Sequence, residues 1–225
     1  MPTTEEADEY EPVERPLPST AASPRPPSDA LVMFGASGDL ARKKLFPAVY
    51  RLHRRRLLNV PVIGVALDAW TDDDLRARAK QAIHEDPETL EDWDEAAFEQ
   101  LASTMHFVSG DYQNPDTFTR LKALLGASQH PVFHLAIPPS MFQTVADGIA
   151  GVGLNEGSRL VIEKPFGRDL TSALELNGAL HAHFKESAIF RIDHFLGKEA
   201  MRSLLITRFA NAILEPLWHL SLIHI

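Results

Sequence analysis

From Asp29 onward, short apolar runs alternate with longer segments in which apolar residues recur at a helical period. The short runs are nearly continuous and rich in β-branched and aromatic residues, which is typical of buried strands. They predict strands at residues 30–34, 60–66, 105–110, 131–137, 159–164 and 188–192.

The segments between these runs carry helix signals. Leu45, Val49 and Leu52 have the i, i+4, i+7 spacing of one buried helix face. Thr71 to Asp74 fits a capping box, and Asn114 followed by Pro115 fits an N-cap with proline in the first turn. Strands buried on both faces that alternate with helices form a parallel sheet with right-handed crossovers. The predicted fold class is therefore α/β, a Rossmann-like doubly wound parallel sheet.

Residues 1–28 have a different composition, rich in proline, serine, threonine and glutamate and without apolar periodicity. Such a segment cannot bury enough apolar surface to fold, so we expect a disordered tail. It lacks the apolar centre of a signal peptide, and no run approaches the roughly 20 apolar residues of a membrane span. Together with the absence of cysteine, this predicts a cytoplasmic protein without a membrane partner.

The composition narrows the possible chemistry. Without cysteine there is no thiolate nucleophile, and we predict no metal site. A formal net charge of −9 argues against nucleic acid as a partner. The basic segment formed by residues 42–44, Arg51 and residues 54–56 is the local exception. It fits either a solvated helix face or a contact with a phosphate-bearing small ligand.

The stretch GASGDL, residues 35–40, follows the first predicted strand and opens a helix. At this turn Gly35 permits a tight bend, Gly38 lets the backbone approach a pyrophosphate, and Ser37 adds a hydroxyl donor. The helix N-terminus offers unpaired N–H groups to the phosphate. A Walker loop is excluded by its different spacing. The predicted dinucleotide-binding residues here are Gly35, Ala36, Ser37, Gly38, Asp39, Leu40 and Lys43.

Further motifs point to a family. GASGDLARKK (35–44), EKPFG (163–167), RIDHFLGKE (191–199) and RFANAILEPLW (208–218) occur in an order and spacing that resemble glucose-6-phosphate dehydrogenase. The resemblance extends from Asp29 to Trp218. It implies a dinucleotide-binding domain at 29–192 and, at 193–219, only the start of a second, α+β domain for substrate binding and dimerisation. Residues 220–225, LSLIHI, leave the family pattern and look like a translated sequencing adaptor, so we expect them to be non-native.

The resemblance implies oxidation of D-glucose 6-phosphate to 6-phosphoglucono-1,5-lactone, a reaction of the oxidative pentose phosphate pathway. In the family the catalytic histidine lies well downstream of RIDHFLGKE, so we expect this chain to be inactive alone. The sheet through which family members dimerise is also downstream. A homodimer or homotetramer is therefore expected only for the full-length protein.

The same resemblance assigns roles at the strand ends. Lys164 would reach both the nicotinamide and the substrate, and Asp193 would orient the catalytic histidine, which makes these two the catalytic candidates. His194 and Lys198, spaced i, i+4, would bind the 6-phosphate by charge-assisted hydrogen bonds. Pro165 would follow a cis bond. Taken without the resemblance, Lys164 fits an ordinary surface turn and Asp193 with His194 fits a structural pair.

Two positions depart from the family pattern. Phe195 stands where a tyrosine is common, which removes a hydroxyl donor to the phosphate. Leu67 and Asp68 follow the second strand, where NADP-preferring members often have arginine. Asp68 would repel a 2′-phosphate, whereas Lys43 or Lys44 would attract one. The family default is NADP, and the sequence predicts dual or NAD-leaning specificity.

Other interpretations remain open. Pro138–Pro139 would line the dinucleotide in the family, or simply stiffen a loop. A non-catalytic Rossmann-type dinucleotide-binding module explains GASGDL but leaves Lys164, His194 and Lys198 as coincidences. Another dehydrogenase or epimerase class would usually show a Tyr-x-x-x-Lys pair, and this chain has none.

Overall fold

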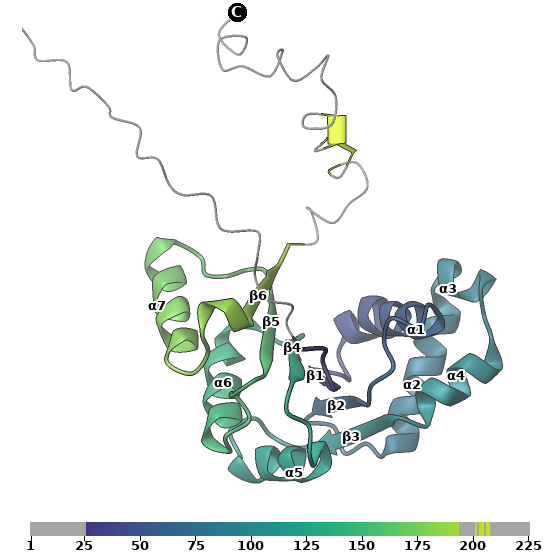
Figure 1. Cartoon of the computed structure of the whole chain (residues 1–225), viewed down its shortest axis with the longest axis horizontal. Helices are drawn as coiled ribbons and strands as arrows, with labels where there is room; N and C mark the ends of the chain where they lie inside the picture. Colours follow the sequence, from purple (N-terminus) through teal and green to yellow (C-terminus); the bar gives the residue numbers. More distant parts are fainter. Residues whose placement is uncertain (1–25, 194–200, 202, 205, 208–225) are drawn as a thin grey trace, which may run out of the picture.

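The computed structural model describes residues 26–193, 201, 203–204 and 206–207. Its centre is one parallel sheet of six strands in the order β3-β2-β1-β4-β5-β6 (Figure 1). The strands are β1 (Ala30–Phe34), β2 (Val62–Ala66), β3 (Met105–Ser109), β4 (Pro131–Leu135), β5 (Arg159–Glu163) and β6 (Ile189–Ile192). This strand order confirms the predicted doubly wound sheet, and every predicted strand is present within one or two residues of its expected ends.

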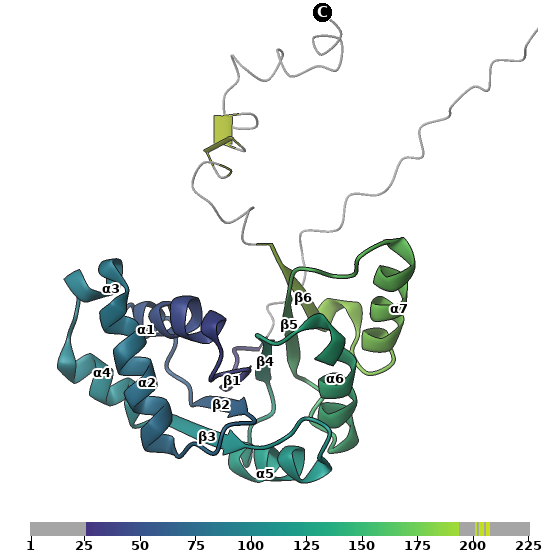
Figure 2. The ribbon, with the colours of Figure 1, turned by 180° about the vertical axis from the view of Figure 1, so that it is seen from behind.

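Helices cover both faces of the sheet (Figures 1 and 2). They are η1 (Ala41–Leu45), α1 (Phe46–Arg54), α2 (Asp72–Glu85), α3 (Pro87–Glu91), α4 (Glu95–Ala102), α5 (Pro115–Leu125), η2 (Pro139–Met141), α6 (Phe142–Gly151), α7 (Leu170–His181) and η3 (Glu186–Ala188). Side chains from η1, α1, α2 and α4 form one apolar core against β1–β3. Those from α5, α6 and α7 form a second core on the other face. Right-handed crossovers require this, because the chain reverses direction across the sheet between β3 and β4.

The first helix corrects one sequence prediction. The Phe46 N–H bonds to the Ala41 carbonyl, five residues back, so a π-turn lies within the first helical segment, just before α1. Pro47 explains this π-turn, since proline lacks an N–H and its ring crowds the carbonyl four residues before it. One extra residue rotates the helix by about 100°. The buried face therefore includes Phe46, Val49 and Tyr50, whereas Leu52, predicted to be buried, is 40% exposed.

Both predicted helix caps are present. The Thr71 hydroxyl accepts a hydrogen bond from the Asp74 N–H at 3.3 Å, and the Asp74 carboxylate accepts one from the Thr71 N–H at 2.8 Å. The Asn114 side chain accepts from the Asp116 N–H at 3.0 Å. These bonds satisfy N–H groups that a helix start leaves without intrahelical partners.

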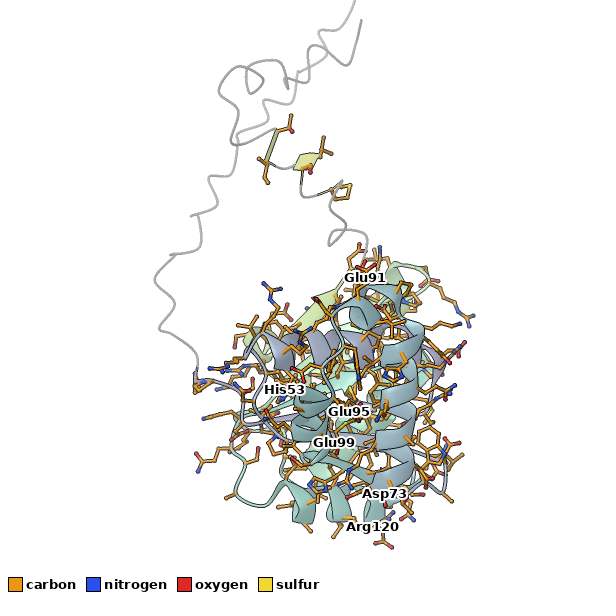
Figure 3. All side chains as sticks on the ribbon, turned by 90° about the vertical axis from the view of Figure 1, so that its right-hand side faces the viewer. His53, Asp73, Glu91, Glu95, Glu99 and Arg120 are labelled. Carbon is orange, nitrogen blue, oxygen red and sulfur yellow. The ribbon has the colours of Figure 1, made fainter. Side chains whose placement is uncertain are left out.

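The outer surface of the α2 and α4 layer is acidic. Asp73, Glu95 and Glu99 lie on it and are exposed (Figure 3). Asp73 pairs with Arg76 at 2.8 Å and Glu95 with Lys80 at 2.5 Å. Part of the chain's negative charge is thus displayed on solvated helix faces rather than at the ends of the strands.

The amino end of the sheet is held by Asp29, directly before β1. Its carboxylate accepts hydrogen bonds from the Ser128 hydroxyl at 2.5 Å, the Gln129 N–H at 2.6 Å and the His130 N–H at 3.0 Å. Burial raises the pKa of Asp29, but these hydrogen bonds outweigh burial and leave the pKa below its ordinary value. The charged carboxylate therefore fastens β1 to the start of β4. Nearby, Pro26 and Ser28, from the range expected to be a tail, accept hydrogen bonds from Arg159.

Replacing Asp29 by asparagine should lower the unfolding free energy near neutral pH by about 1 kcal/mol, because a neutral amide accepts fewer and weaker hydrogen bonds. Since the folded-state pKa of Asp29 is lowered, its stabilisation is present above the ordinary pKa and is lost as pH falls through the folded value. The difference between wild type and Asp29→Asn in urea unfolding should therefore shrink in acid. Asp73→Asn, an exposed control, should change stability by less than about 0.5 kcal/mol. Equal effects of the two variants on stability at neutral pH would contradict the role of Asp29 in linking β1 to the start of β4.

Candidate functional site

All six strands are parallel, so the segments that follow them meet at one edge of the sheet, the carboxyl edge. In doubly wound folds this edge binds ligands near the point where the strand order reverses, here between β1 and β4. The predicted site residues that the structure describes follow these strands: residues 35–40 and Lys43 after β1, Asp68 after β2, Lys164 after β5 and Asp193 after β6.

The turn after β1 can be built only with glycine at its first position. Gly35 has a φ of +81°, and its N–H donates to the Val65 carbonyl at 2.9 Å. An added Cβ would lie 2.3 Å from the Ala136 carbonyl oxygen, so the backbone passes directly against the end of β4. Gly38 closes the turn, with its N–H donating to the Gly35 carbonyl at 3.0 Å. The sequence-predicted role of Gly35 in a tight bend matches this geometry.

This turn fits a pyrophosphate. A helical turn begins at Asp39, and the first turn of a helix leaves its N–H groups without intrahelical acceptors and with a partial positive charge. A Cβ built on Gly38 would meet only the Gly35 carbonyl oxygen, at 3.2 Å, so protein atoms leave the outer side of the turn open. Ala36 is buried and packs against Gly64 of β2, which brings the turn close to the sheet.

Lys43 is held one turn into the helix by an ion pair. Its ammonium lies 2.8 Å from the Asp39 carboxylate, which also contacts Arg42 at 3.4 Å. The hydrogen bond from Lys43 holds the pKa of Asp39 below its ordinary value. Lys43 therefore lies beside the glycine turn, and its cofactor-binding role stays a prediction.

The rest of the basic segment lies elsewhere. Because α1 runs back toward the start of β2, residues 54–56 lie at the opposite, amino edge of the sheet. Arg51 pairs there with Glu88 at 3.0 Å, and Arg54 with Asp92 at 3.8 Å. For Arg51 and residues 54–56 the solvated helix face is the better interpretation. Arg42 bonds mainly to Glu85 at the end of α2, at 2.7 Å, whereas Lys43 lies beside Asp39 next to the glycine turn.

Lys164 and Asp193 come together across the ends of β5 and β6. The Lys164 ammonium lies 2.8 Å from the Asp193 carboxylate, and the two side chains are 58% and 24% exposed. The Lys164–Pro165 peptide bond is cis. His194, Phe195 and Lys198 lie outside the described residues. The structure thus brings together the two catalytic candidates but does not describe the predicted phosphate-binding residues.

A histidine and a glutamate lie close together on β4 and β5. His134 of β4 and Glu163 of β5 are 3.3 Å apart, with side chains 11% and 10% exposed. The strand register pairs His134 with Val161, so Glu163 is its diagonal neighbour on the same face. Sequence reasoning missed this contact, because nothing in either segment indicates which residue of the other strand it faces.

Tyr112, which the sequence places only in a loop, is the other residue that sequence reasoning missed. Its hydroxyl accepts a hydrogen bond from the Gly35 N–H at 2.9 Å and donates one to the Val65 carbonyl at 3.0 Å. Burial, with a smaller contribution from the negative charge of Asp68, raises the pKa of Tyr112 to about 12, against the lowering effect of the hydrogen bond from Gly35. Asp68 itself follows β2 and is exposed.

Other features do not compete with this edge. A hollow of about 610 Å³, lined by His130, Arg159 and Lys185 among others, lies at the amino ends of β4–β6. None of the predicted site residues that the structure describes lines it. Within the part of the chain that the structure describes, no three histidine, aspartate or glutamate side chains gather as metal ligands. Over the same residues, no helix is long and apolar enough to cross a membrane.

Comparison with known proteins identifies the domain. The family model for the NAD-binding domain of glucose-6-phosphate dehydrogenase matches residues 32–203. Glucose-6-phosphate 1-dehydrogenase 1 of Mycobacterium tuberculosis is 42% identical over 201 residues, which are 88% of this chain and 42% of the relative. The Dictyostelium discoideum glucose-6-phosphate 1-dehydrogenase is 39% identical over 204 residues, or 85% of this chain and 39% of the relative.

Solved structures agree. A glucose-6-phosphate 1-dehydrogenase from Mycobacterium avium has a TM-score of 0.76 at 45% identity, over 85% of this chain and 41% of that one. A glucose-6-phosphate dehydrogenase in complex with its substrate glucose-6-phosphate also has a TM-score of 0.76, at 34% identity, over 86% of this chain and 42% of that one. The chain thus spans about two fifths of the length of these relatives. Its strand order, its glycine turn and the extent of the family match lead to one conclusion: the chain belongs to the glucose-6-phosphate dehydrogenase family and contains that family's nicotinamide dinucleotide-binding domain.

Proposed function

We propose that this chain is the dinucleotide-binding part of a glucose-6-phosphate 1-dehydrogenase, which oxidises D-glucose 6-phosphate to 6-phosphoglucono-1,5-lactone. The observation that carries the proposal is the common edge of the sheet. The glycine turn after β1 and the Lys164–Asp193 pair after β5 and β6 lie at the same ends of parallel strands. A dinucleotide and a sugar phosphate bound there would be neighbours, as hydride transfer requires. A relative of 34% identity is known in complex with glucose-6-phosphate.

The chain's own residues would divide the work as follows. When bound, the nicotinamide cofactor would accept the hydride from C1 of the sugar. The N–H groups after Gly35 would hold the pyrophosphate. Lys164 would donate a hydrogen bond on the C1 side of the sugar. Asp193 would fix the position of the Lys164 ammonium group. We also assign to Asp193 the orientation of the downstream catalytic histidine, and to His194 and Lys198 the binding of the 6-phosphate.

The cofactor preference follows from charge at the end of β2. Asp68 is exposed there and would repel a 2′-phosphate, whereas Lys43 would attract it once released from Asp39. We propose use of both NADP and NAD by the full-length enzyme. We also propose a cytoplasmic location, a role in the oxidative pentose phosphate pathway, and a homodimeric or homotetrameric assembly.

The alternative is a non-catalytic dinucleotide-binding module. It accounts for the glycine turn equally well. It gives no reason for Lys164 and Asp193 to pair at 2.8 Å on the ligand-bearing edge, which favours the enzyme. A module of this kind would bind dinucleotide and ignore glucose 6-phosphate, so titration with both ligands separates the two functions.

Gly35→Ala tests the dinucleotide site. The new Cβ would collide with the Ala136 carbonyl in a backbone conformation that favours glycine, so the turn must move. We expect the NADPH dissociation constant, measured by fluorescence titration of the 225-residue chain, to rise at least about tenfold. Gly126→Ala is the matched control, with a φ of +56° but no atom within 4 Å of its Cβ. It should cost about 1 kcal/mol of stability and leave the dissociation constant unchanged. Unimpaired binding by Gly35→Ala would refute the assignment.

Asp68→Ala tests cofactor discrimination. Removing the negative charge should raise the affinity for NADPH relative to NADH by about fivefold, because only NADPH carries a 2′-phosphate. Lys43→Gln should shift the ratio in the opposite direction. Asp73→Ala, which removes the same charge from the exposed α2 surface, should leave the ratio unchanged. An unchanged ratio of NADPH to NADH affinity in Asp68→Ala would show that other residues distinguish the 2′-phosphate from the 2′-hydroxyl.

Lys164→Gln tests the sugar site. With dinucleotide saturating, the dissociation constant for glucose 6-phosphate measured by calorimetry should rise about tenfold, since a charged donor is lost. Dinucleotide affinity should change little. The control Lys185→Gln removes an exposed lysine at the opposite edge of the sheet. Glucose 6-phosphate binding that is equally strong in wild type and Lys164→Gln would contradict the role given to Lys164. We expect no turnover by the 225-residue chain; measurable oxidation would instead indicate His194 as the base.

A further inference from the structure

The turn after β1, the loop after β3 and the end of β2 meet at the hydroxyl group of Tyr112. The residue lies after β3, yet it accepts the Gly35 N–H at 2.9 Å from the turn after β1. It also donates to the Val65 carbonyl of β2 at 3.0 Å. The Gly35 N–H is shared between Tyr112 and Val65, because it lies 2.9 Å from the Val65 carbonyl as well. Donor, acceptor and hydroxyl thus form a closed triangle at the start of the glycine turn.

The loop that carries Tyr112 is itself fixed. The Thr117 hydroxyl donates to the Asp111 carbonyl at 2.8 Å, and the Asp111 carboxylate accepts from the Gln113 N–H at 2.9 Å. Thr117 is fully buried. A Cβ at Gly110 would lie 2.2 Å from the Thr117 hydroxyl oxygen, so β3 passes into this loop against α5 without space to shift. The hydroxyl of Tyr112 is therefore delivered to Gly35 from a firmly anchored segment.

The ring of Tyr112 adds a second restraint. It packs edge-to-face on Phe34, with ring centroids 5.6 Å apart and planes at 74°. Such a contact stabilises an aromatic pair beyond simple burial. The Tyr112 hydroxyl is neutral near physiological pH, as any tyrosine hydroxyl is, and burial raises its pKa to about 12; it can therefore both donate and accept.

Gly35 is consequently confined on both sides. Toward β4, the Ala136 carbonyl lies so close that no side chain fits. Toward β2, Val65 and Tyr112 hold its N–H. The direction of the following N–H groups depends on this residue, since the helix start leads away from it. A small displacement of these N–H donors would weaken ligand binding, because their hydrogen bonds depend on preorganised geometry.

We propose that Tyr112 is a positioning residue for dinucleotide binding: its hydroxyl holds the glycine turn in the orientation that presents the helix N-terminus to the pyrophosphate. This inference rests on the proposed function of the turn. It assigns no contact between Tyr112 and the ligand. Its effect is transmitted through the backbone of Gly35.

The chain supplies a matched control in Tyr50. Tyr50 is fully buried, whereas Tyr112 is partly buried, and the Tyr50 hydroxyl likewise accepts a backbone N–H, that of Asp94, at 2.7 Å. It belongs to α1 and packs against Trp93 with ring centroids 5.3 Å apart, in the core that faces α4. Tyr50→Phe therefore removes an equivalent hydroxyl without touching the glycine turn.

The experiment compares wild type, Tyr112→Phe and Tyr50→Phe as 225-residue chains. NADPH and NADH dissociation constants are measured by fluorescence titration, and melting temperatures by circular dichroism. We expect both variants to melt lower than wild type. Only Tyr112→Phe should weaken binding, by about three- to tenfold for both dinucleotides, the size expected for one misplaced set of hydrogen bonds. Equal losses for the two dinucleotides would place the effect at the shared pyrophosphate.

The outcomes separate the two proposals. If wild type binds neither dinucleotide, the proposed function fails. If wild type binds and Tyr112→Phe binds equally well, the function stands and the positioning role is wrong. Equal loss of affinity in Tyr50→Phe would show a general stability effect and also overturn it. Should Tyr112→Phe fail to fold, Thr117→Ala loosens the same loop at the Asp111 carbonyl, with Thr117→Ser as its rescue. Weaker dinucleotide binding by Thr117→Ala that is restored in Thr117→Ser would support the positioning role of Tyr112. Unchanged binding by Thr117→Ala would contradict it.

Discussion

The binding edge depends on one close approach, that of the Gly35 backbone to the Ala136 carbonyl. The chain leaves β1 between two neighbours, β2 and β4, and the only way past them is a turn with positive φ and no side chain. This approach sets the direction of the helix that follows and hence of its N–H groups. The requirement is steric and local, which explains why it can be recognised in the sequence as GASGDL.

Ion pairs hold two lysine side chains at the carboxyl edge of the sheet. Two of the candidate lysines are held by carboxylates, Lys43 by Asp39 and Lys164 by Asp193, each at 2.8 Å. All four side chains are at least partly exposed, so these pairs add little to stability. They keep the ammonium groups near the places where phosphate or sugar oxygens would arrive. An incoming anion would then replace a carboxylate rather than gather a mobile side chain from solvent.

Tyr112 connects the segments that follow β1, β2 and β3 at the carboxyl edge. The glycine turn belongs to the first crossover and Asp68 to the second, and Tyr112 after β3 lies in reach of both. The adjoining loops of β1, β2 and β3 thus act as one unit. On the other half of the sheet, the His134–Glu163 contact joins β4 to β5 at the residue before Lys164. Tyr112, His134 and Glu163 are given no ligand contact, but they lie next to residues that are proposed to bind the ligands.

The sequence by itself determined the strands, the two helix caps and the edge of the sheet at which the motifs meet. These features depend on local patterns: apolar runs, capping residues, and parallel strands whose ends must coincide. Even the family could be recognised, because its motifs are short and contiguous. The buried face of α1 could not be predicted correctly, since the π-turn before Pro47 shifts the helical register that the spacing of Leu45, Val49 and Leu52 assumes.

Only the tertiary structure decided which distant side chains meet. Nothing near Tyr112 in the chain indicates Gly35, which is 77 residues away, and nothing near His134 indicates Glu163. The separation of Arg51 and residues 54–56 from the glycine turn likewise follows from the path of α1 across the sheet. Such contacts are fixed by strand register and by the packing of whole helices, which depend on the sum of many weak interactions rather than on any one motif.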